Sequence, residues 1–257
     1  MSAQRIWQGL FWGGLALAAL GGVMFAVPAL QFIPPALPLG LGLAALGVNV
    51  LGRGELTAAP PPRSFTARGQ VVRGTFTAAA GLCDLIVSDS VGERIAQVQF
   101  GPAGEPDFAV EDGVARLALE APRFPPAAND WRADLANNVL WDVDARASLG
   151  HLLMDLRDLR LERASARTSL GRIHVALPQR GYAEISLRST MGEIEVTIPD
   201  GVGVEATVRG GRLSTVTVEN KRLLAPGRNR YVTADYNTAL AQVLLTVETA
   251  SGDVIFS

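Results

Sequence analysis

The stretches LGRIHVALP, residues 170–178, and MGEIEVTIP, residues 191–199, repeat one pattern of glycine, alternating apolar residues and proline. Gly171 aligns with Gly192, so the offset is 192 − 171 = 21 residues. One period earlier, Gly150 occupies the equivalent position and is again followed by an alternating apolar series. Because overlooking a repeat misassigns a whole fold, this period is the feature from which the fold is predicted.

Strict alternation is typical of a half-buried strand, because successive side chains point to opposite faces of the pleat. Ile173, Val175 and Leu177 are therefore expected to face the core. A unit of this length has room for a second short strand, and the alternation over residues 183–187 marks one. Strands one period apart can stack in parallel, as they do in solenoids.

Glycine begins each unit, and Gly171 and Gly192 are predicted to have positive φ, which strongly favours glycine. Two further copies begin at Gly81 and Gly252 outside the regular array, and we expect them to form irregular first and last rungs. The predicted fold class is all-β: a repetitive, right-handed β-solenoid-like domain with repeats of about 21 residues, preceded by a two-helix transmembrane hairpin.

The hairpin is predicted because no Lys, Arg, Asp or Glu occurs between Arg5 and Arg53. Residues 6–27 and 35–51 are apolar runs close to the length of about 20 residues that a spanning helix needs. Arginines flank the pair but not its turn, so the positive-inside rule places the N-terminus and the β domain on the cytoplasmic side of the membrane, in a multi-pass protein. A cleaved signal peptide would have a shorter apolar region. The predicted organisation is a hairpin over residues 1–52, a Pro/Ala-rich linker over 53–63 and the β domain over 64–257.

The residues that most often carry chemistry form no recognisable motif. The chain has 23 basic and 25 acidic residues, a balance that indicates no nucleic-acid partner. Cys83 is the single cysteine, and its phase in the repeat predicts a buried thiol. His151 and His174 are the two histidines, and they lack the spacing of metal ligands. Neither a phosphate loop nor a dinucleotide fingerprint occurs. The sequence predicts no catalytic residues, no cofactor and no metal.

The segment DWRADLANNVLW, residues 130–141, is the least repetitive part of the β domain. Trp131, Asn137, Asn138 and Trp141 form a candidate interaction surface there, because exposed aromatic side chains anchor many interfaces. The alternative, that the tryptophans cover the end of the repeat core, is favoured.

An apolar hairpin, a spacer and strands led by SLG (148–150 and 169–171) and TMG (190–192) together resemble a bacterial family. The chain is similar to the toast-rack or putative-adhesin β domain of LiaF-like membrane-anchored proteins. The resemblance implies no enzyme activity and an accessory role beside a sensor kinase in envelope-stress signalling. LiaF-like proteins often have more transmembrane helices than the two expected here.

We therefore expect a non-enzymatic interaction or regulatory protein whose partners are the lipid bilayer and a membrane sensor kinase or another membrane protein. The alternative is a surface-exposed adhesive or structural β domain, which requires the opposite topology. A third hypothesis is a hydrolase that uses carboxylates with His151 or His174, because catalytic groups converge in space and not in sequence. Exposed strand edges would also allow a homo-oligomer.

Overall fold

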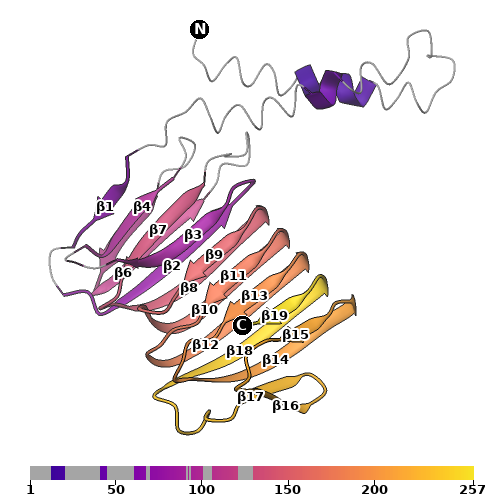
Figure 1. Ribbon diagram of the computed structural model, residues 1–257. Helices are drawn as coiled ribbons and strands as arrows, with labels where there is room; N and C mark the ends of the chain where they lie inside the picture. The colour runs from indigo at the N-terminus through magenta and orange to yellow at the C-terminus, as the bar shows by residue number, and fades with distance from the viewer. Residues whose placement is uncertain are drawn as a thin grey trace. The chain divides into compact units, whose positions relative to one another are not determined.

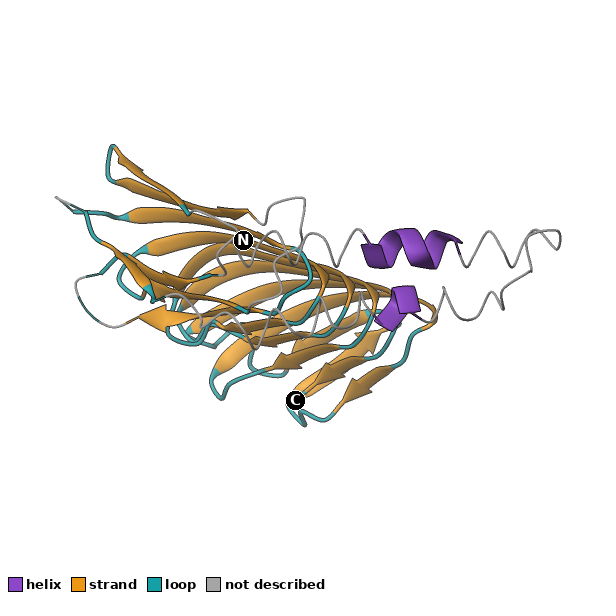
Figure 2. Ribbon diagram, turned by 90° about the horizontal axis from the view of Figure 1, so that it is seen from above, coloured by secondary structure: helices purple, strands orange, loops and turns teal. Residues whose placement is uncertain are grey.

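A computed structural model of the chain describes residues 13–20, 41–44, 61–67, 70–90, 92, 94–100, 106–120 and 130–257. The chain divides into two compact units, Met1–Ala58 and Ala59–Ser257. In the first unit, residues 13–20 and 41–44 are helical (Figure 1). The second, hereafter the β unit, consists of strands and loops in its described part (Figure 2).

The described helices correct the membrane prediction. Among the described residues, no helix is long and apolar enough to cross a membrane. A span needs about 20 residues, whereas the longer described helix covers residues 13–20. This finding contradicts the two-helix transmembrane hairpin and the predicted multi-pass location in the cytoplasmic membrane, with the N-terminus and β domain inside. The other residues of the predicted spans, 6–27 and 35–51, lie outside the described part of the chain.

The described residues of the β unit form nineteen strands in two sheets, which confirms the all-β prediction. In spatial order, the nine-stranded sheet contains β1 (Arg63–Phe65), β4 (Ala96–Gln99), β7 (Trp131–Ala136), β3 (Leu85–Ser90), β9 (Leu152–Asp155), β11 (Ile173–Ala176), β13 (Ile194–Thr197), β19 (Val254–Phe256) and β15 (Val216–Val218). The ten-stranded sheet contains β16 (Leu223–Gly227), β17 (Arg230–Thr233), β14 (Val202–Leu213), β18 (Ala241–Ser251), β12 (Gly181–Met191), β10 (Arg160–Leu170), β8 (Leu140–Leu149), β2 (Arg73–Ala80), β6 (Val114–Glu120) and β5 (Asp107–Glu111).

The sequence period sets the register at the centre of both sheets. Ile173 of β11 lies beside Leu152 of β9 and Ile194 of β13, and the differences 173 − 152 and 194 − 173 are both 21. In the ten-stranded sheet, the same offset relates Ala145 of β8 to Ala166 of β10. These pairs are parallel, so successive units stack as the repeat predicts. The right-handed solenoid winding stays a prediction.

The alternating residues form the core between the two sheets. Ile173, Val175 and Leu177 are each 0% exposed, as expected for the inward phase of the repeat. Ile185 and Leu187 of β12 supply equally buried side chains from the ten-stranded sheet. One apolar cluster contains these residues from both sheets, so each repeat unit is stabilised by its neighbours and not by itself.

At one end of the array, β18 and β19 interrupt the sequence order. Leu187 of β12 pairs with Val247 of β18, which pairs on its other side with Val208 of β14. Leu187 and Val208 are themselves one period apart, because 208 − 187 = 21. The C-terminal strand β18 therefore lies where direct continuation would place β14. In the other sheet, β19 likewise lies between β13 and β15 (Figure 1).

A similar rearrangement occurs at the other end of the array. Leu85 of β3 pairs with Leu152, and Ala78 of β2 pairs with Ala145, while the strands β6, β5, β7, β4 and β1 lie beyond them. The strands that follow Gly81 and Gly252, β3 and β19, thus flank the three regular units, as predicted. They do not end the sheet, because distant segments that a local period does not reveal return to pair beyond them.

The glycines that begin the units stack on one another. A Cβ added to Gly171 would lie 2.0 Å from the carbonyl oxygen of Gly150, and one added to Gly192 would lie 1.9 Å from that of Gly171. Gly252 has the same relation to Gly192, at 2.0 Å. The φ angles of Gly171 (150°) and Gly192 (143°) are positive, as predicted. Close approach of neighbouring backbones therefore adds a second requirement for glycine.

Candidate functional site

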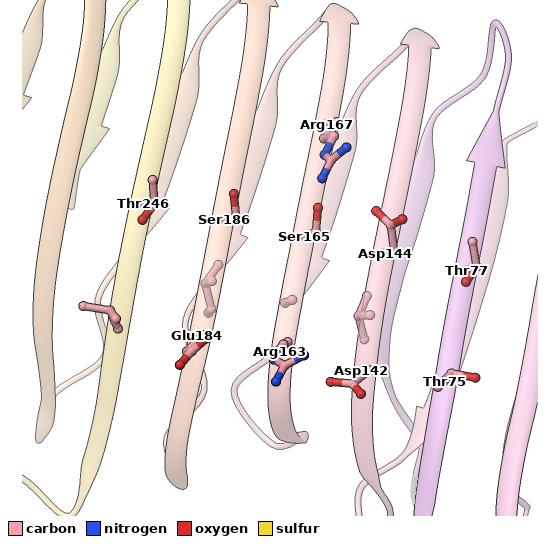
Figure 3. A pocket seen from close by; sticks show the side chains of 14 residues that line it. Thr75, Thr77, Asp142, Asp144, Arg163, Ser165, Arg167, Glu184, Ser186 and Thr246 are labelled. Atoms are coloured by element: carbon pink, nitrogen blue, oxygen red, sulfur yellow. The ribbon is translucent and has the colours of Figure 1, made fainter.

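An open groove crosses the outer face of the ten-stranded sheet. It has a volume of about 550 Å³ and extends over β2, β8, β10, β12 and β18. Figure 3 shows the polar side chains of these five strands on one face. They occupy the outward phase of the same alternation that builds the core, so the groove is a direct product of the strand pattern.

Three rows of side chains run across β8, β10 and β12 at this face, and each row consists of residues one period apart. The mixed row is Asp142, Arg163 and Glu184, the hydroxyl row is Asp144, Ser165 and Ser186, and the arginine row is Arg146, Arg167 and Arg188. Thr77 of β2 and Thr246 of β18 extend the hydroxyl row at its two ends. Since neighbouring strands lie about 4.8 Å apart, arginines and hydroxyl groups recur at that spacing in two of the rows, whereas the mixed row alternates in charge.

The arginine row is unequally neutralised. Arg146 donates hydrogen bonds to Asp144, with a shortest distance of 2.5 Å. Arg188 and Arg209 lie 3.9 and 3.0 Å from Glu248, which the inserted strand β18 places between them. Within the described part of the chain, neither Arg163 nor Arg167 has a hydrogen bond or ion pair to a side chain. Two exposed guanidinium groups therefore face the groove without a protein counter-charge in contact.

The groove also contains two polar atoms with unused hydrogen-bonding capacity. Asp142 Oδ1 and Ser165 Oγ are shielded from solvent, and neither has a hydrogen-bond partner among the described residues. A shielded polar atom without a partner costs about 1–3 kcal/mol. Such an atom needs an explanation, and a water molecule or a ligand group in the groove can supply the missing hydrogen bond.

The candidate interaction surface predicted from the sequence is not brought together. Trp131 and Trp141 are 1% and 0% exposed, and Trp141 Nε1 donates a 2.8 Å hydrogen bond to the carbonyl oxygen of Ala136. The tryptophans are thus core residues, as the favoured alternative holds, because their strand phase points them between the sheets. Asn137 and Asn138 form the turn between β7 and β8, and only Asn138 is exposed. A binding role for this turn stays a prediction.

The other residues considered for chemistry are separated. Cys83 is 3% exposed, and its burial, with the nearby charges of Asp130 and Asp84, raises the pKa of the thiol to about 12. His174 Nδ1 lies 3.0 Å from Glu195, whereas His151 Nδ1 accepts a hydrogen bond from the backbone N–H of Arg172. Among the described residues, no group of His, Cys, Asp and Glu side chains is arranged to hold a metal ion.

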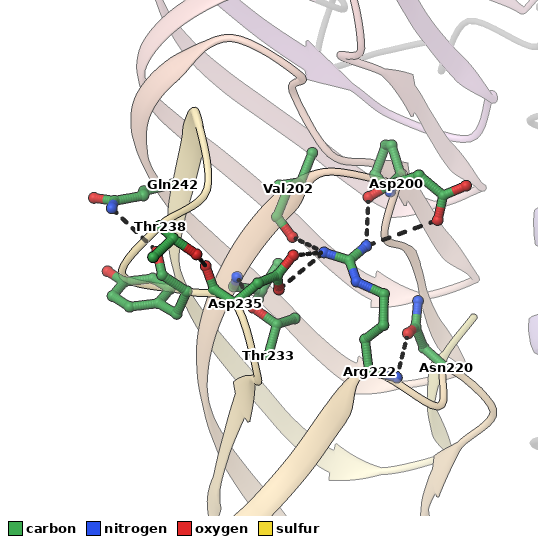
Figure 4. A network of polar contacts seen from close by, with 11 residues as sticks. Asp200, Val202, Asn220, Arg222, Thr233, Asp235, Thr238 and Gln242 are labelled. Atoms are coloured by element: carbon green, nitrogen blue, oxygen red, sulfur yellow. Dashed lines mark hydrogen bonds and ion pairs between the residues drawn. The ribbon is translucent and has the colours of Figure 1, made fainter.

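A separate polar cluster surrounds Arg222 (Figure 4). Its guanidinium donates to the carbonyl oxygens of Pro199 and Val202, at 3.1 and 2.8 Å. The same group donates to both carboxylate oxygens of Asp235, at 3.1 and 2.8 Å. These contacts tie the segment around β16 and β17 to the start of β14. The cluster is satisfied by protein groups, so its role is to hold this segment in place.

The arginine row of the groove has its own signal in the sequence, in addition to the apolar pattern. Arginine recurs at positions 146, 167, 188 and 209, always at an offset of 21. The same period that predicts the core therefore also identifies the arginine row, once it is applied to the outward positions.

Comparison with known proteins supports the fold. No family model and no curated protein matches the chain. A solved structure described as a putative cell adhesion protein from Clostridium sporogenes has 16% sequence identity and a TM-score of 0.67, covering 76% of this chain and 97% of its own. A putative adhesin from Bacteroides fragilis has 10% identity and a TM-score of 0.31, covering 77% and 96%. The β unit therefore shares its fold with the Clostridium sporogenes protein.

Proposed function

We propose that the chain is a non-enzymatic binding protein whose β unit attaches to an extended ligand through the groove of the ten-stranded sheet. The observation that carries this proposal is the pair Arg163 and Arg167, which face the groove without an ion pair among the described residues. A charged group without a protein partner is available to a ligand, and a guanidinium suits carboxylate or phosphate groups.

The repetition of the site supports binding over catalysis. A catalytic site needs a single constellation held in one geometry, whereas the groove offers similar groups on successive strands. Repeated weak contacts suit attachment, because their combined strength can exceed that of each one alone. The structurally similar Clostridium sporogenes protein is described as a putative cell adhesion protein, and an adhesive or structural role for this chain agrees with a groove of this kind.

The accessory role in envelope-stress signalling is the second candidate, and it rests on the sequence resemblance to LiaF-like proteins. It predicts a protein partner such as a sensor kinase. The groove favours the adhesive function, because a repeated row of charged and hydroxyl groups suits a repeating ligand better than a unique protein surface.

The test is a binding experiment with the full-length chain immobilised on beads. The beads are exposed to an array of cell-surface polysaccharides, glycoproteins and extracellular matrix proteins, and retained material is measured. We expect the wild-type chain to retain at least one polymer, and Arg167→Glu to reduce retention about tenfold or more, because it reverses the charge at an exposed contact.

The matched control is Arg228→Glu, which makes the same change of charge at an exposed position in the turn between β16 and β17. This variant should retain the polymer as the wild type does. If Arg167→Glu and Arg228→Glu behave alike for every retained polymer, the groove is not the binding site. If no polymer is retained, the adhesive function is contradicted.

A further inference from the structure

We propose that the ligand of the groove is an acidic polysaccharide, which lies across the strands with its anionic groups on the arginine row. This inference rests on the proposed function and specifies the class of ligand. It follows from three features of the groove: the spacing of its rows, the distribution of its charges and the hydrogen-bonding capacity of its hydroxyl and mixed rows.

The spacing of the rows suits a polysaccharide better than a peptide. Five neighbouring strands about 4.8 Å apart give a track of about 19 Å, which about four or five extended sugar units cover. An extended peptide advances about 3.3 Å per residue and would fall out of step with the rows. Extended peptides also bind at sheet edges, where free backbone groups pair with them, whereas this groove lies on the face of a sheet.

The charges give the groove two unlike sides. On one side, Arg167 stands without an ion pair among the described residues, between Arg146 and Arg188. The charge of Arg146 is met by Asp144, and that of Arg188 is shared with Glu248. Arg167 is therefore the strongest anchor for a uronic acid carboxylate, which a guanidinium can bind through two parallel hydrogen bonds.

The mixed row, on the other side of the groove, and the hydroxyl row, on its floor, suit sugar hydroxyl groups. Asp142 and Glu184 can accept hydrogen bonds from a ligand, Arg163 can donate them, and the hydroxyls of Ser165 and Ser186 can do both. A sugar hydroxyl is likewise both donor and acceptor, so it can satisfy these neighbours together. The partnerless atoms Asp142 Oδ1 and Ser165 Oγ lie among these residues. The carboxylates of the mixed row, Asp142 and Glu184, disfavour a ligand with anions on both sides.

The experiment measures binding of the full-length chain by isothermal titration calorimetry. The probes are short fragments of polygalacturonate, alginate and hyaluronate, which differ in linkage but all carry uronic acids. Two comparison probes separate the contributions: methyl-esterified oligogalacturonate keeps the hydroxyls without the charge, and poly-L-glutamate keeps the charge without the sugar. At least one uronic acid probe should bind at least about tenfold more tightly than either comparison probe, since both kinds of contact are required.

Variants locate the interaction on the groove. Arg167→Ala should weaken binding of the uronic acid probe about tenfold or more, because it removes the unpaired guanidinium. Ser165→Ala, a smaller change at the floor, should weaken binding about threefold or more by removing a hydrogen bond. Arg228→Ala is the control and should leave the affinity unchanged. Circular dichroism and thermal unfolding of each variant check that the fold is retained.

The outcomes distinguish this inference from the proposed function. If none of the three uronic acid probes binds, or if poly-L-glutamate binds as tightly, the ligand class is wrong. The proposed function then still stands if Arg167→Glu, and not Arg228→Glu, abolishes retention of another polymer on the beads. If a uronic acid probe binds but Arg167→Ala and Arg228→Ala bind it equally, both the inference and the groove are rejected.

Discussion

The stacked glycines impose the most severe local constraint in the array. Gly171→Ala should lower the free energy of unfolding by about 3 kcal/mol or more, because strain at positive φ is combined with a collision against the backbone of the neighbouring unit. The added Cβ would lie 2.0 Å from the carbonyl oxygen of Gly150, and backbone on both sides limits relaxation. Chemical denaturation of the full-length chain measures the change.

Gly181→Ala is the matched control for that change. Gly181 also has a positive φ, 75°, but nothing lies within 4 Å of the Cβ that alanine would add. It should cost only about 1–2 kcal/mol, the usual strain of a left-handed residue. Equal losses of stability in the two variants would show that φ alone, and not the contact between neighbouring glycines, sets the requirement.

Cys83 gives a second prediction for a single residue. Burial, followed by the charge of Asp130, raises the pKa of its thiol to about 12, so the thiolate that reacts with alkylating reagents is scarce at pH 8. Iodoacetamide should label the native chain far more slowly than the chain unfolded in guanidinium, as followed by mass spectrometry. Labelling at the rate of an exposed thiol in the native chain would contradict the placement of Cys83 in the core.

Among the elements of the fold, the segment around β16 and β17 depends on the bond between Arg222 and Asp235. Arg222→Met should increase hydrogen exchange of this segment and lower stability by about 1–3 kcal/mol, since hydrogen bonds to a charged group are lost. Arg222 is 27% exposed and Asp235 40% exposed, so solvent screening favours the lower end of that range. Arg228→Met, in the same segment, should change neither quantity.

The same bond predicts how this segment responds to acid. Desolvation is the largest single influence and raises the pKa of Asp235, but hydrogen bonds from its own backbone, Arg222 and Thr233, with the charge of Arg222, bring it below its usual value. A lowered folded-state pKa contributes stability above the unfolded value, and this contribution is lost as the pH falls through the folded value. Asp235→Asn should therefore make the segment less sensitive to pH below about 4. An unchanged acid dependence of hydrogen exchange would contradict this account.

At the scale of the whole molecule, the position of β18 and β19 determines how much the stability of the core depends on the C-terminal strands. In a simple repeat array, loss of the last unit removes one rung and leaves the rest intact. Here, truncation after Leu240 removes β18 from between β12 and β14 in one sheet and β19 from between β13 and β15 in the other. The apolar side chains that pack against these two strands become exposed. We expect the truncated chain to lose its cooperative thermal transition and to bind a hydrophobic dye. A single transition at nearly the wild-type temperature in chain 1–240 would exclude this arrangement.

The period of 21 residues by itself determined the central part of the fold. It predicted the parallel register of β9, β11 and β13, the inward phase of Ile173 and Val175 and the positive φ of Gly171 and Gly192. These features are readable because alternation and turn chemistry are local: each residue's face follows from its neighbours in the chain. The recurrence of arginine at 146, 167 and 188 is an equally local signal.

Only the tertiary structure decided which strands lie at the ends of the array and what faces the groove. The sequence order places β14 after β12, but β18 pairs with both, and it thereby sets Glu248 between Arg188 and Arg209. The same folding places Trp131 and Trp141 in the core and not on a surface. The physical reason is that pairing of distant segments depends on how completely the whole core is buried, and a local pattern carries no information about that choice.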